Sequence, residues 1–479
     1  MVMNGDCFDD GRLSYSDIAI IGGGCSGVLT AAGILRAGGR GALTIIEPRA
    51  FLGRGLAYST PYREHLLNVP AGGMSAFPDK PSDFVDWLRN QEWPGAGPSV
   101  FAPRHLYGEY LEHALISETL RNNRGADLKH VRAEVVKIAV EREYAVLDLS
   151  DSSRLGARRV VLALGNPASS PSVSGAVLPG LEDSCHPSPW LQDSLRVRRT
   201  SERILVLGTG LTAVDSALAL FGQGMDSRVW MLSKRGILPQ VHRPSPAAGV
   251  LPLPPLEGHS LGHILREVRA QIRNLREAGR CWRTVVDALR PISNQLWSQL
   301  PLRDRKRYAR HLKTYWENHR HRMAPEIFER IESCWKSGVL HVSAGRLLRA
   351  VPCEDAIEVR IQRRGEEVTT LMVDRIINCT GIEERYAESP RPLIRTIVAT
   401  GLGKPNDLGT GFLTDEHGGL IDSAGRASPV LFTLGPPRRG QLFETTAVPE
   451  IRSQAAALAQ HLSVNARSGM RTRLANEQD

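Results

Sequence analysis

The sequence predicts an α/β protein that contains two Rossmann-like dinucleotide-binding domains. Two glycine-rich turns carry this prediction, Gly22-Gly-Gly-Cys-Ser-Gly27 and Gly208-Thr-Gly-Leu-Thr-Ala213. Each turn follows a short apolar strand and precedes a helix and a second apolar strand, which is the order of a β-α-β nucleotide-binding unit. The third observation is the length of 479 residues, which exceeds a single compact core and predicts two or three domains.

The first unit has each part that dinucleotide binding requires. Asp17 to Ile21 is the strand, the glycines follow with G-x-G-x-x-G spacing, and Val28 to Arg36 continues as a helix. The glycines permit the tight turn and the approach of a pyrophosphate, and the helix N-terminus attracts phosphate. The second strand ends at Glu47, whose carboxylate can accept hydrogen bonds from a ribose. The predicted binding residues are Gly22, Gly24, Cys25, Ser26, Gly27 and Glu47.

The second unit differs from the first at the end of its second strand. Ser233-Lys-Arg235 begins twenty residues after Ala213, the interval that separates Gly27 from Glu47. Two cations replace the ribose-binding acid and would attract a 2′-phosphate, which favours NADP(H) over NAD(H). A solvated basic strand end and a unit without a ligand are the alternatives. The predicted binding residues are Gly208, Gly210, Leu211, Thr212, Ala213, Ser233, Lys234 and Arg235.

Two different nucleotides are therefore expected. The simplest assignment of cofactors is FAD on the first unit and NADPH on the second, with the nicotinamide passing hydride to the flavin.

Composition restricts the class of protein. The net charge of +9, from 60 basic and 51 acidic side chains, is mild for this length and does not indicate a nucleic acid partner. The seven cysteines are scattered without a C-x-x-C pair, which predicts reduced thiols in the cytoplasm and neither a metal site nor a redox dithiol. The uncharged stretch from Ile18 to Leu35 contains the phosphate turn, so we interpret it as strand, turn and helix rather than a membrane span.

Leu261 to Gly338 is predicted to be mostly helical and strongly basic. Cations from Arg303 to Lys313 continue into His319-Arg-His-Arg322. Three interpretations stay open: a solvated helix face, an electropositive wall for an acidic substrate or NADP phosphates, and a contact surface for a partner. His319 and His321 are two residues apart and do not share a helix face, which argues against a metal site.

Several longer segments carry a family resemblance. They are Gly55-Leu-Ala-Tyr-Ser-Thr60, His65-Leu-Leu-Asn-Val-Pro70, Met74-Ser-Ala-Phe-Pro-Asp79, Phe84-Val-Asp-Trp-Leu88, Gly208 to Asp215, Tyr315-Trp316, His319 to Arg322 and Thr445 to Arg452. Over roughly residues 16 to 462 the chain resembles a family of FAD/NAD(P)-binding proteins among the two-dinucleotide-fold flavoproteins. That group includes flavin monooxygenases, ornithine-type N-hydroxylases and pyridine-nucleotide disulfide reductases, and nitrosuccinate synthase is a more distant analogy.

The resemblance implies a discontinuous FAD domain with the NADP domain inserted. The expected boundaries are 14–190 for the first part of the FAD domain, 200–370 for the NADP domain with a helical insertion at about 257–338, 371–465 for the second part of the FAD domain, and 466–479 for a loose tail. It also places further cofactor contacts beside the flavin or at the closing unit of its domain: Asn68, Met74, Val136, Gly381, Gly435 and Val448.

The resemblance and the cofactor pair imply a reaction. Without a C-x-x-C pair, disulfide reduction lacks its chemistry, whereas a monooxygenase needs NADPH, FAD, oxygen and a dry pocket that protects a C4a-hydroperoxyflavin. The apolar loop from His65 to Phe77 supplies such a wall. We expect N-hydroxylation of a small amine or amino acid. A dehydrogenase or reductase without oxygen insertion and a non-catalytic flavin-binding partner protein are the alternatives. His65 and Glu444 are the candidate catalytic residues.

Overall fold

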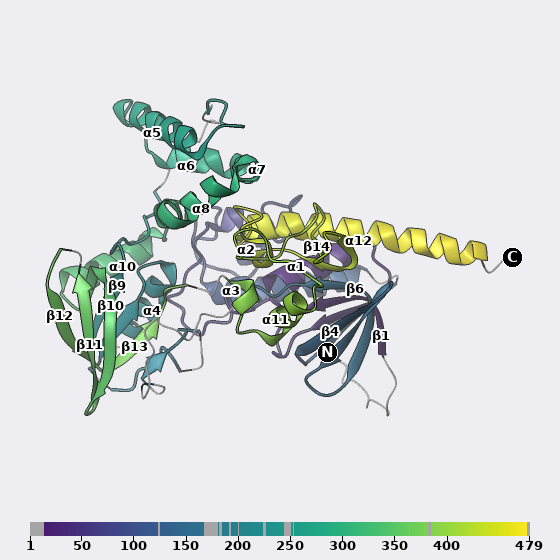
Figure 1. The fold of residues 1–479 in the computed structure, drawn as a ribbon, viewed down its shortest axis with the longest axis horizontal. Helices are drawn as coiled ribbons and strands as arrows, with labels where there is room; N and C mark the ends of the chain where they lie inside the picture. Colours follow the sequence, from purple (N-terminus) through teal and green to yellow (C-terminus); the bar gives the residue numbers. More distant parts are fainter. Residues whose placement is uncertain are drawn as a thin grey trace.

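The structure is a computed structural model that describes residues 14–122, 125–166, 181, 184–190, 193–199, 201–223, 227–243, 251, 253–363, 365–381 and 385–476, with side chains described through Ser463. The linker expected at 168–180 and most of the proline-rich segment from 244 to 255 lie outside these residues. The described part divides into two α/β lobes and a helical extension (Figure 1).

The first lobe is built on an eight-stranded sheet. Its main order is β14-β15-β6-β1-β2-β3, and β5 pairs with both β6 and β4. The central strands β6, β1, β2 and β3 are parallel, with Ile21 opposite Ile46 and Leu162, so the apolar runs in the sequence become strands buried on both faces. The strand bounds are β1 (Ser14–Ile21), β2 (Gly41–Ile46), β3 (Ala126–Val131), β4 (Val135–Glu141), β5 (Tyr144–Leu149), β6 (Arg154–Leu162), β14 (Gly419–Ile421) and β15 (Ala427–Thr433).

Helices cover this sheet. The core on one side joins α1, α3 and α12 with α2 and the loop from Leu67 to Phe77, and α11 packs over the other side. Their bounds are α1 (Cys25–Arg36), α2 (Asp83–Asn90), α3 (Arg104–Arg121), α11 (Pro392–Ala399) and α12 (Val448–Asn476). Helix α12 runs to Asn476, so residues 466–476 of the segment predicted as a loose tail are helical (Figure 1).

The second lobe has a seven-stranded sheet with the order β12-β11-β10-β9-β8-β13-β7. The bounds are β7 (Cys185–His186), β8 (Arg203–Leu207), β9 (Arg228–Ser233), β10 (Leu340–Cys353), β11 (Ala356–Arg363), β12 (Val368–Val373) and β13 (Arg375–Asn378). Strand β13 pairs in parallel with β8 and β7, so the second lobe includes both. The predicted boundaries at 190 and 371 therefore need correction, since residues 185–186 and 375–378 belong to this sheet. Helices α4 (Leu211–Phe221) and α10 (Pro325–Lys336) pack against it.

The helical extension comprises α5 (Leu261–Glu277), α6 (Arg283–Leu289), α7 (Ser293–Gln299), α8 (Leu302–His311) and α9 (Lys313–Arg320), and most of it projects away from both sheets (Figure 1). Short 3₁₀ turns lie at Ala71–Gly73, Arg290–Ile292, Tyr386–Glu388 and Pro436–Arg438. The extension is narrower than the predicted 257–338, because Ile327 and Ile331 of α10 belong to the core of the second lobe. None of the helices in the described part is both long and apolar enough to cross a membrane.

Candidate functional site: two phosphate turns

The first glycine turn has the geometry of a phosphate cradle. Gly22 has a φ of +103°, which L side chains rarely adopt, and a Cβ on Gly27 would lie 1.9 Å from the carbonyl oxygen of Gly22. Helix α1 begins directly after this turn with Gly24 as its N-cap and no capping side chain, so its first N–H groups point out of the turn. Gly24 also faces Gly55, whose Cα would lie 3.3 Å from an added Cβ. A loop of the same lobe thus lies against the turn.

Glu47 is fixed at the end of β2 beside this turn. Its Oε2 accepts a hydrogen bond of 2.9 Å from the Gly23 N–H, and its Oε1 accepts one of 2.8 Å from Nε of Arg49. Burial by itself would raise the pKa of Glu47, but the hydrogen bonds from Arg49 and Gly23 outweigh it and the pKa is lowered. The carboxylate is held ionised and keeps acceptor capacity for hydroxyl groups.

The second turn repeats the backbone of the first with more open space. Gly208 has a φ of +118°, and a Cβ there would lie 2.4 Å from the Cys379 carbonyl oxygen. Gly210 is the N-cap of α4 and again no side chain caps the helix. A Cβ on Gly210 would meet nothing within 4 Å. This turn is accessible where the first is covered.

The cations after β9 lie beside the second turn but differ in their surroundings. The Ser233 hydroxyl is 2.9 Å from the Thr209 hydroxyl, which joins the strand end to the glycine turn. Lys234 is exposed. Arg235 is half-buried because it reaches α9, where Nη1 donates to Thr314 Oγ1 at 3.0 Å and the guanidinium lies 4.9 Å from the Tyr315 ring centroid.

The C-terminal unit closes over the first turn. A Cβ on Gly435 would lie 3.1 Å from Oγ of Ser26, so the two predicted residues are neighbours. Gln454 accepts from the Gly435 N–H at 3.0 Å, and the Thr445 hydroxyl donates to the Gly435 carbonyl at 2.8 Å. Val448, the first residue of α12, is buried in the same core. The start of α12 is therefore held against the phosphate turn.

The predicted wall from His65 to Phe77 is partly buried, because buried and half-buried residues are interspersed along it up to Gly73 and the rest is buried. Met74 belongs to the core of the first lobe, and Asn68 is half-buried with its carbonyl oxygen 3.0 Å from Nε2 of His242. The thiol of Cys25, next to this core, has a pKa raised to about 12 by burial, which leaves it neutral.

His65 does not fit a catalytic role. It is fully buried, with Nδ1 2.7 Å from the Thr60 hydroxyl and Nε2 2.9 Å from the Asp215 carbonyl oxygen. Burial lowers its pKa and keeps the ring neutral. Both ring nitrogens are thus occupied, Nδ1 by Thr60 of the same lobe and Nε2 by the Asp215 carbonyl of α4.

The structure also shows where Val136 and Gly381, two predicted cofactor contacts, lie. Val136 is 46 % exposed on β4, whereas Val135 beside it is buried, so the Val136 side chain faces away from the lobe core. Gly381 follows β13, and the neighbouring Cys379 N–H bonds to Leu207 in the second sheet. Gly381 therefore belongs to the second turn and not to the closing unit of the first lobe.

Glu444 is part of a buried ionic contact with the helical extension. Arg320 Nε donates to its Oε1 at 3.1 Å, and the two side chains are only 8 % and 5 % exposed. Burial raises the pKa of Glu444, and Arg320 opposes the rise. With its carboxylate engaged in this pair, Glu444 positions the chain ahead of α12 rather than acting as a predicted catalytic acid.

Asn294, which no motif in the sequence marks, holds the same segment in place. Its Oδ1 accepts from the N–H groups of Phe443 and Glu444 at 2.8 and 2.9 Å, and its Nδ2 donates to the Glu444 carbonyl at 3.1 Å. Phe443 in turn contacts the rings of Trp297, Tyr308 and Trp316 at 5.1–5.5 Å. An isolated asparagine on a short helix carries no sequence signal, so only the fold reveals this contact.

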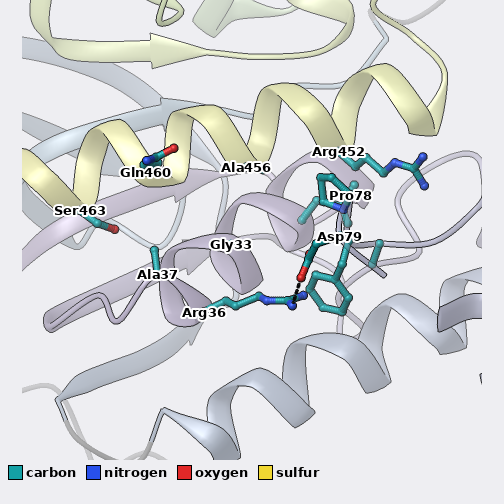
Figure 2. A pocket seen from close by; sticks show the side chains of 12 residues that line it. Gly33, Arg36, Ala37, Pro78, Asp79, Arg452, Ala456, Gln460 and Ser463 are labelled. Atoms are coloured by element: carbon teal, nitrogen blue, oxygen red, sulfur yellow. Dashed lines mark hydrogen bonds and ion pairs between the residues drawn. The ribbon is translucent and has the colours of Figure 1, made fainter. Parts of the chain in front are cut away.

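A separate cavity of about 480 Å³ lies along the far half of α1 (Figure 2). It is bounded by α1, the segment from Ala76 to Asp79 and the middle of α12, and an ion pair between Arg36 and Asp79 crosses its edge. Leu29, Gly33 and Arg36 of α1 line it, and the phosphate turn is not in its lining. The cavity is therefore distinct from the dinucleotide cradle.

Both cradles fit the cofactors that the fold implies. In each case glycine leaves room where a Cβ would collide, the helix N-terminus is uncapped, and the residue after the second strand has the charge that its nucleotide requires. An adenosine ribose suits the Glu47 carboxylate, and a 2′-phosphate suits Lys234 and Arg235.

Comparison with known proteins agrees with this architecture. Residues 19–167 match a family model described as FAD-NAD(P)-binding. No functionally curated protein matches the sequence. Among solved structures, the ornithine N-hydroxylase of Kutzneria sp. 744 is 15% identical with a TM-score of 0.64, covering 94% of this chain and 100% of its own.

Two further structures extend the comparison. The cadaverine monooxygenase of Erwinia amylovora, solved with FAD, is 13% identical with a TM-score of 0.64 and covers 94% of this chain and 95% of its own. The bacillithiol disulfide reductase of Staphylococcus aureus is 12% identical with a TM-score of 0.54 and covers 95% and 99%. The chain therefore has the fold of the two-dinucleotide-fold flavoproteins, with a FAD-NAD(P)-binding domain at residues 19–167.

Proposed function

We propose that the protein is an FAD- and NADPH-dependent monooxygenase that N-hydroxylates a small amine or amino acid. The observation that carries the proposal is the pair of phosphate turns in separate sheets, one followed by Glu47 and the other by Lys234 and Arg235. Solved structures of similar fold are named as an ornithine N-hydroxylase and a cadaverine monooxygenase, which supports this reaction class.

The residues of the chain have defined tasks in this proposal. Gly22, Gly24 and Gly27 with the start of α1 hold the FAD pyrophosphate, and Glu47 accepts hydrogen bonds from its ribose. Gly208 and Gly210 with α4 hold the NADPH pyrophosphate, and Lys234 and Arg235 bind its 2′-phosphate. When bound, the two cofactors supply hydride transfer and oxygen activation.

Exclusion of water is the second task. Met74 is buried in the same core as Val28 near the start of α1, and Phe443 lies among aromatic side chains of the helical extension. These apolar walls limit the access of solvent to the cofactor region, which oxygenation requires because water diverts reactive oxygen species to peroxide.

The six cysteines described are free thiols, which supports the proposed cytoplasmic location.

The test uses the purified protein with FAD, NADPH and a panel of small amines and amino acids. We expect NADPH consumption to rise with one substrate class and to match the hydroxylamine product in amount. Peroxide formation in place of product with every amine would reject N-hydroxylation and favour a reductase without oxygen insertion. Protein that binds FAD but does not oxidise NADPH would favour the non-catalytic binding protein.

A further inference from the structure

Helix α9 touches both candidate cofactor sites. At its first turn, Thr314 accepts a hydrogen bond from Arg235, and Tyr315 stacks under the same guanidinium. At its last residue, Arg320 forms the buried ion pair with Glu444. Thr314 and Arg320 are six residues apart, so roughly 9 Å of helix separates the two contacts.

The contact at Arg235 leaves the side chain ready for an anion. Its Nη1 donates to Thr314, and its Nη2 donates at 3.4 Å to the His311 carbonyl oxygen. These bonds use two of the five N–H groups of a guanidinium and fix its plane. An arginine held in this way loses less conformational entropy when it binds a phosphate, since its rotamer is already chosen.

The contact at Arg320 holds the start of the C-terminal helix. Its guanidinium lies 3.1 Å from Glu444 and 3.9 Å from Glu450, and Arg290 donates to Glu450 at 2.8 Å. Glu444 immediately precedes Thr445, which bonds to Gly435 beside the first phosphate turn. Separating a buried ion pair costs free energy, because each charge is left without its partner. When α9 moves, the Glu444 segment that closes the FAD site should therefore move with Arg320.

We propose that α9 couples the two sites, so that a 2′-phosphate on Arg235 tightens the segment from Gly435 to Glu450 around FAD. This inference rests on the proposed function, since it takes the first turn as the FAD site and the second as the NADPH site. Thr314, Tyr315 and Arg320 are then positioning residues. The coupling is specific for NADP(H), because NAD(H) lacks the phosphate that engages Arg235.

The experiment measures the release of FAD from the holoprotein in saturating NADP⁺ and, separately, in saturating NAD⁺. We expect NADP⁺ to slow FAD release about fivefold or more relative to NAD⁺, which is within the usual range of coupling between sites. The flavin absorbance spectrum should also shift with NADP⁺ and not with NAD⁺. Saturation separates the coupling from any change in NADP⁺ affinity.

Two sets of variants decide the role of α9. Arg320→Gln removes the contact at the FAD side, and the double variant Thr314→Val with Tyr315→Leu removes the contact at the NADP side. Both should bring the NADP⁺ to NAD⁺ ratio of FAD release rates to about one. Arg330→Gln, at an exposed position on α10, is the matched control and should keep the wild-type ratio.

A retained ratio in either set of variants overturns the proposal, as does a wild-type protein without any difference between NADP⁺ and NAD⁺. If Arg320→Gln does not fold, the double variant still decides, because Thr314 is half-buried and Tyr315 exposed. Failure of the proposed function is separately visible as protein that takes up no FAD or oxidises no NADPH.

Discussion

The two phosphate turns share a backbone but differ in what surrounds them. At the first turn, Gly55 lies against Gly24, Glu47 is bonded to Gly23, and α12 closes over Ser26 through Gly435. At the second turn, Gly210 faces open space and Lys234 is exposed. An enclosed cradle suits a cofactor that stays bound through many turnovers, and an open one suits a cosubstrate that must leave after each.

The third glycine position gives the sharpest test of this comparison. Gly27→Ala introduces the residue that the second turn already has at Ala213, but its Cβ would lie 1.9 Å from the Gly22 carbonyl. We expect loss of bound FAD and destabilisation by about 1–3 kcal/mol from overpacking. Flavin absorbance of the purified protein and thermal unfolding measure the two effects.

The reverse change, Ala213→Gly, is the control. It should cost about 1 kcal/mol of helix stability and keep FAD bound. A Gly27→Ala variant that retains FAD and has the melting temperature of the wild-type protein would show that the first turn is not closely packed around a pyrophosphate.

The cations of the second turn should affect the use of NADPH and not that of NADH. Substituting Arg235→Gln in one variant and Lys234→Gln in another removes charge-assisted hydrogen bonds of about 1.5–3 kcal/mol each, so kcat/KM for NADPH should fall about 10- to 100-fold. The value for NADH should change little. Steady-state kinetics with both nucleotides makes the comparison, and an equal loss for both would assign the cations a structural role.

The Glu47 carboxylate should make the stability of the folded protein depend on pH in the acidic range. Its pKa in the folded protein lies below the usual value of 4.5, so its stabilising effect is complete above about pH 4.5 and is lost as the pH falls through the folded pKa. The melting temperature of the FAD-free protein should therefore fall on acidification. In Glu47→Gln this part of the decline should be absent, and identical pH profiles would contradict the assignment.

Val136 should have the smallest effect. Its side chain is exposed on β4, so Val136→Ala should change stability by less than about 0.5 kcal/mol and leave FAD affinity unaltered. Equilibrium titration with FAD checks this expectation. A marked loss of affinity would restore Val136 to the first cradle.

Local patterns in the sequence were sufficient for the fold class and for the position of both turns. The glycine spacing and apolar strands are short-range signals, and Gly27 and Ala213 lie where the β-α-β pattern puts them. Pairing between distant strands carries no such signal. Strand β13 was therefore assigned to the wrong sheet, although it completes the second one beside β8.

The same limit explains the errors at the candidate site. His65 has a residue type typical of catalysis, but Thr60, five residues away, engages one ring nitrogen, and the Asp215 carbonyl meets the other only after the lobes pack. Arg320 was one cation in a basic run, and its burial against Glu444 depends on a contact across 124 residues. Residue type and spacing identify the cradles, whereas the use of an isolated side chain depends on tertiary neighbours.

The contact around Asp215 bears on how the nucleotide enters and leaves. Arg104 of α3 pairs with this carboxylate at 2.7 Å, and His65 joins the same residue from the first lobe. Rotation of one lobe relative to the other would separate the buried Asp215 carboxylate from the Arg104 guanidinium in every catalytic cycle, which costs free energy. We therefore expect a fixed interlobe orientation, with small-angle scattering profiles that coincide with and without NADPH.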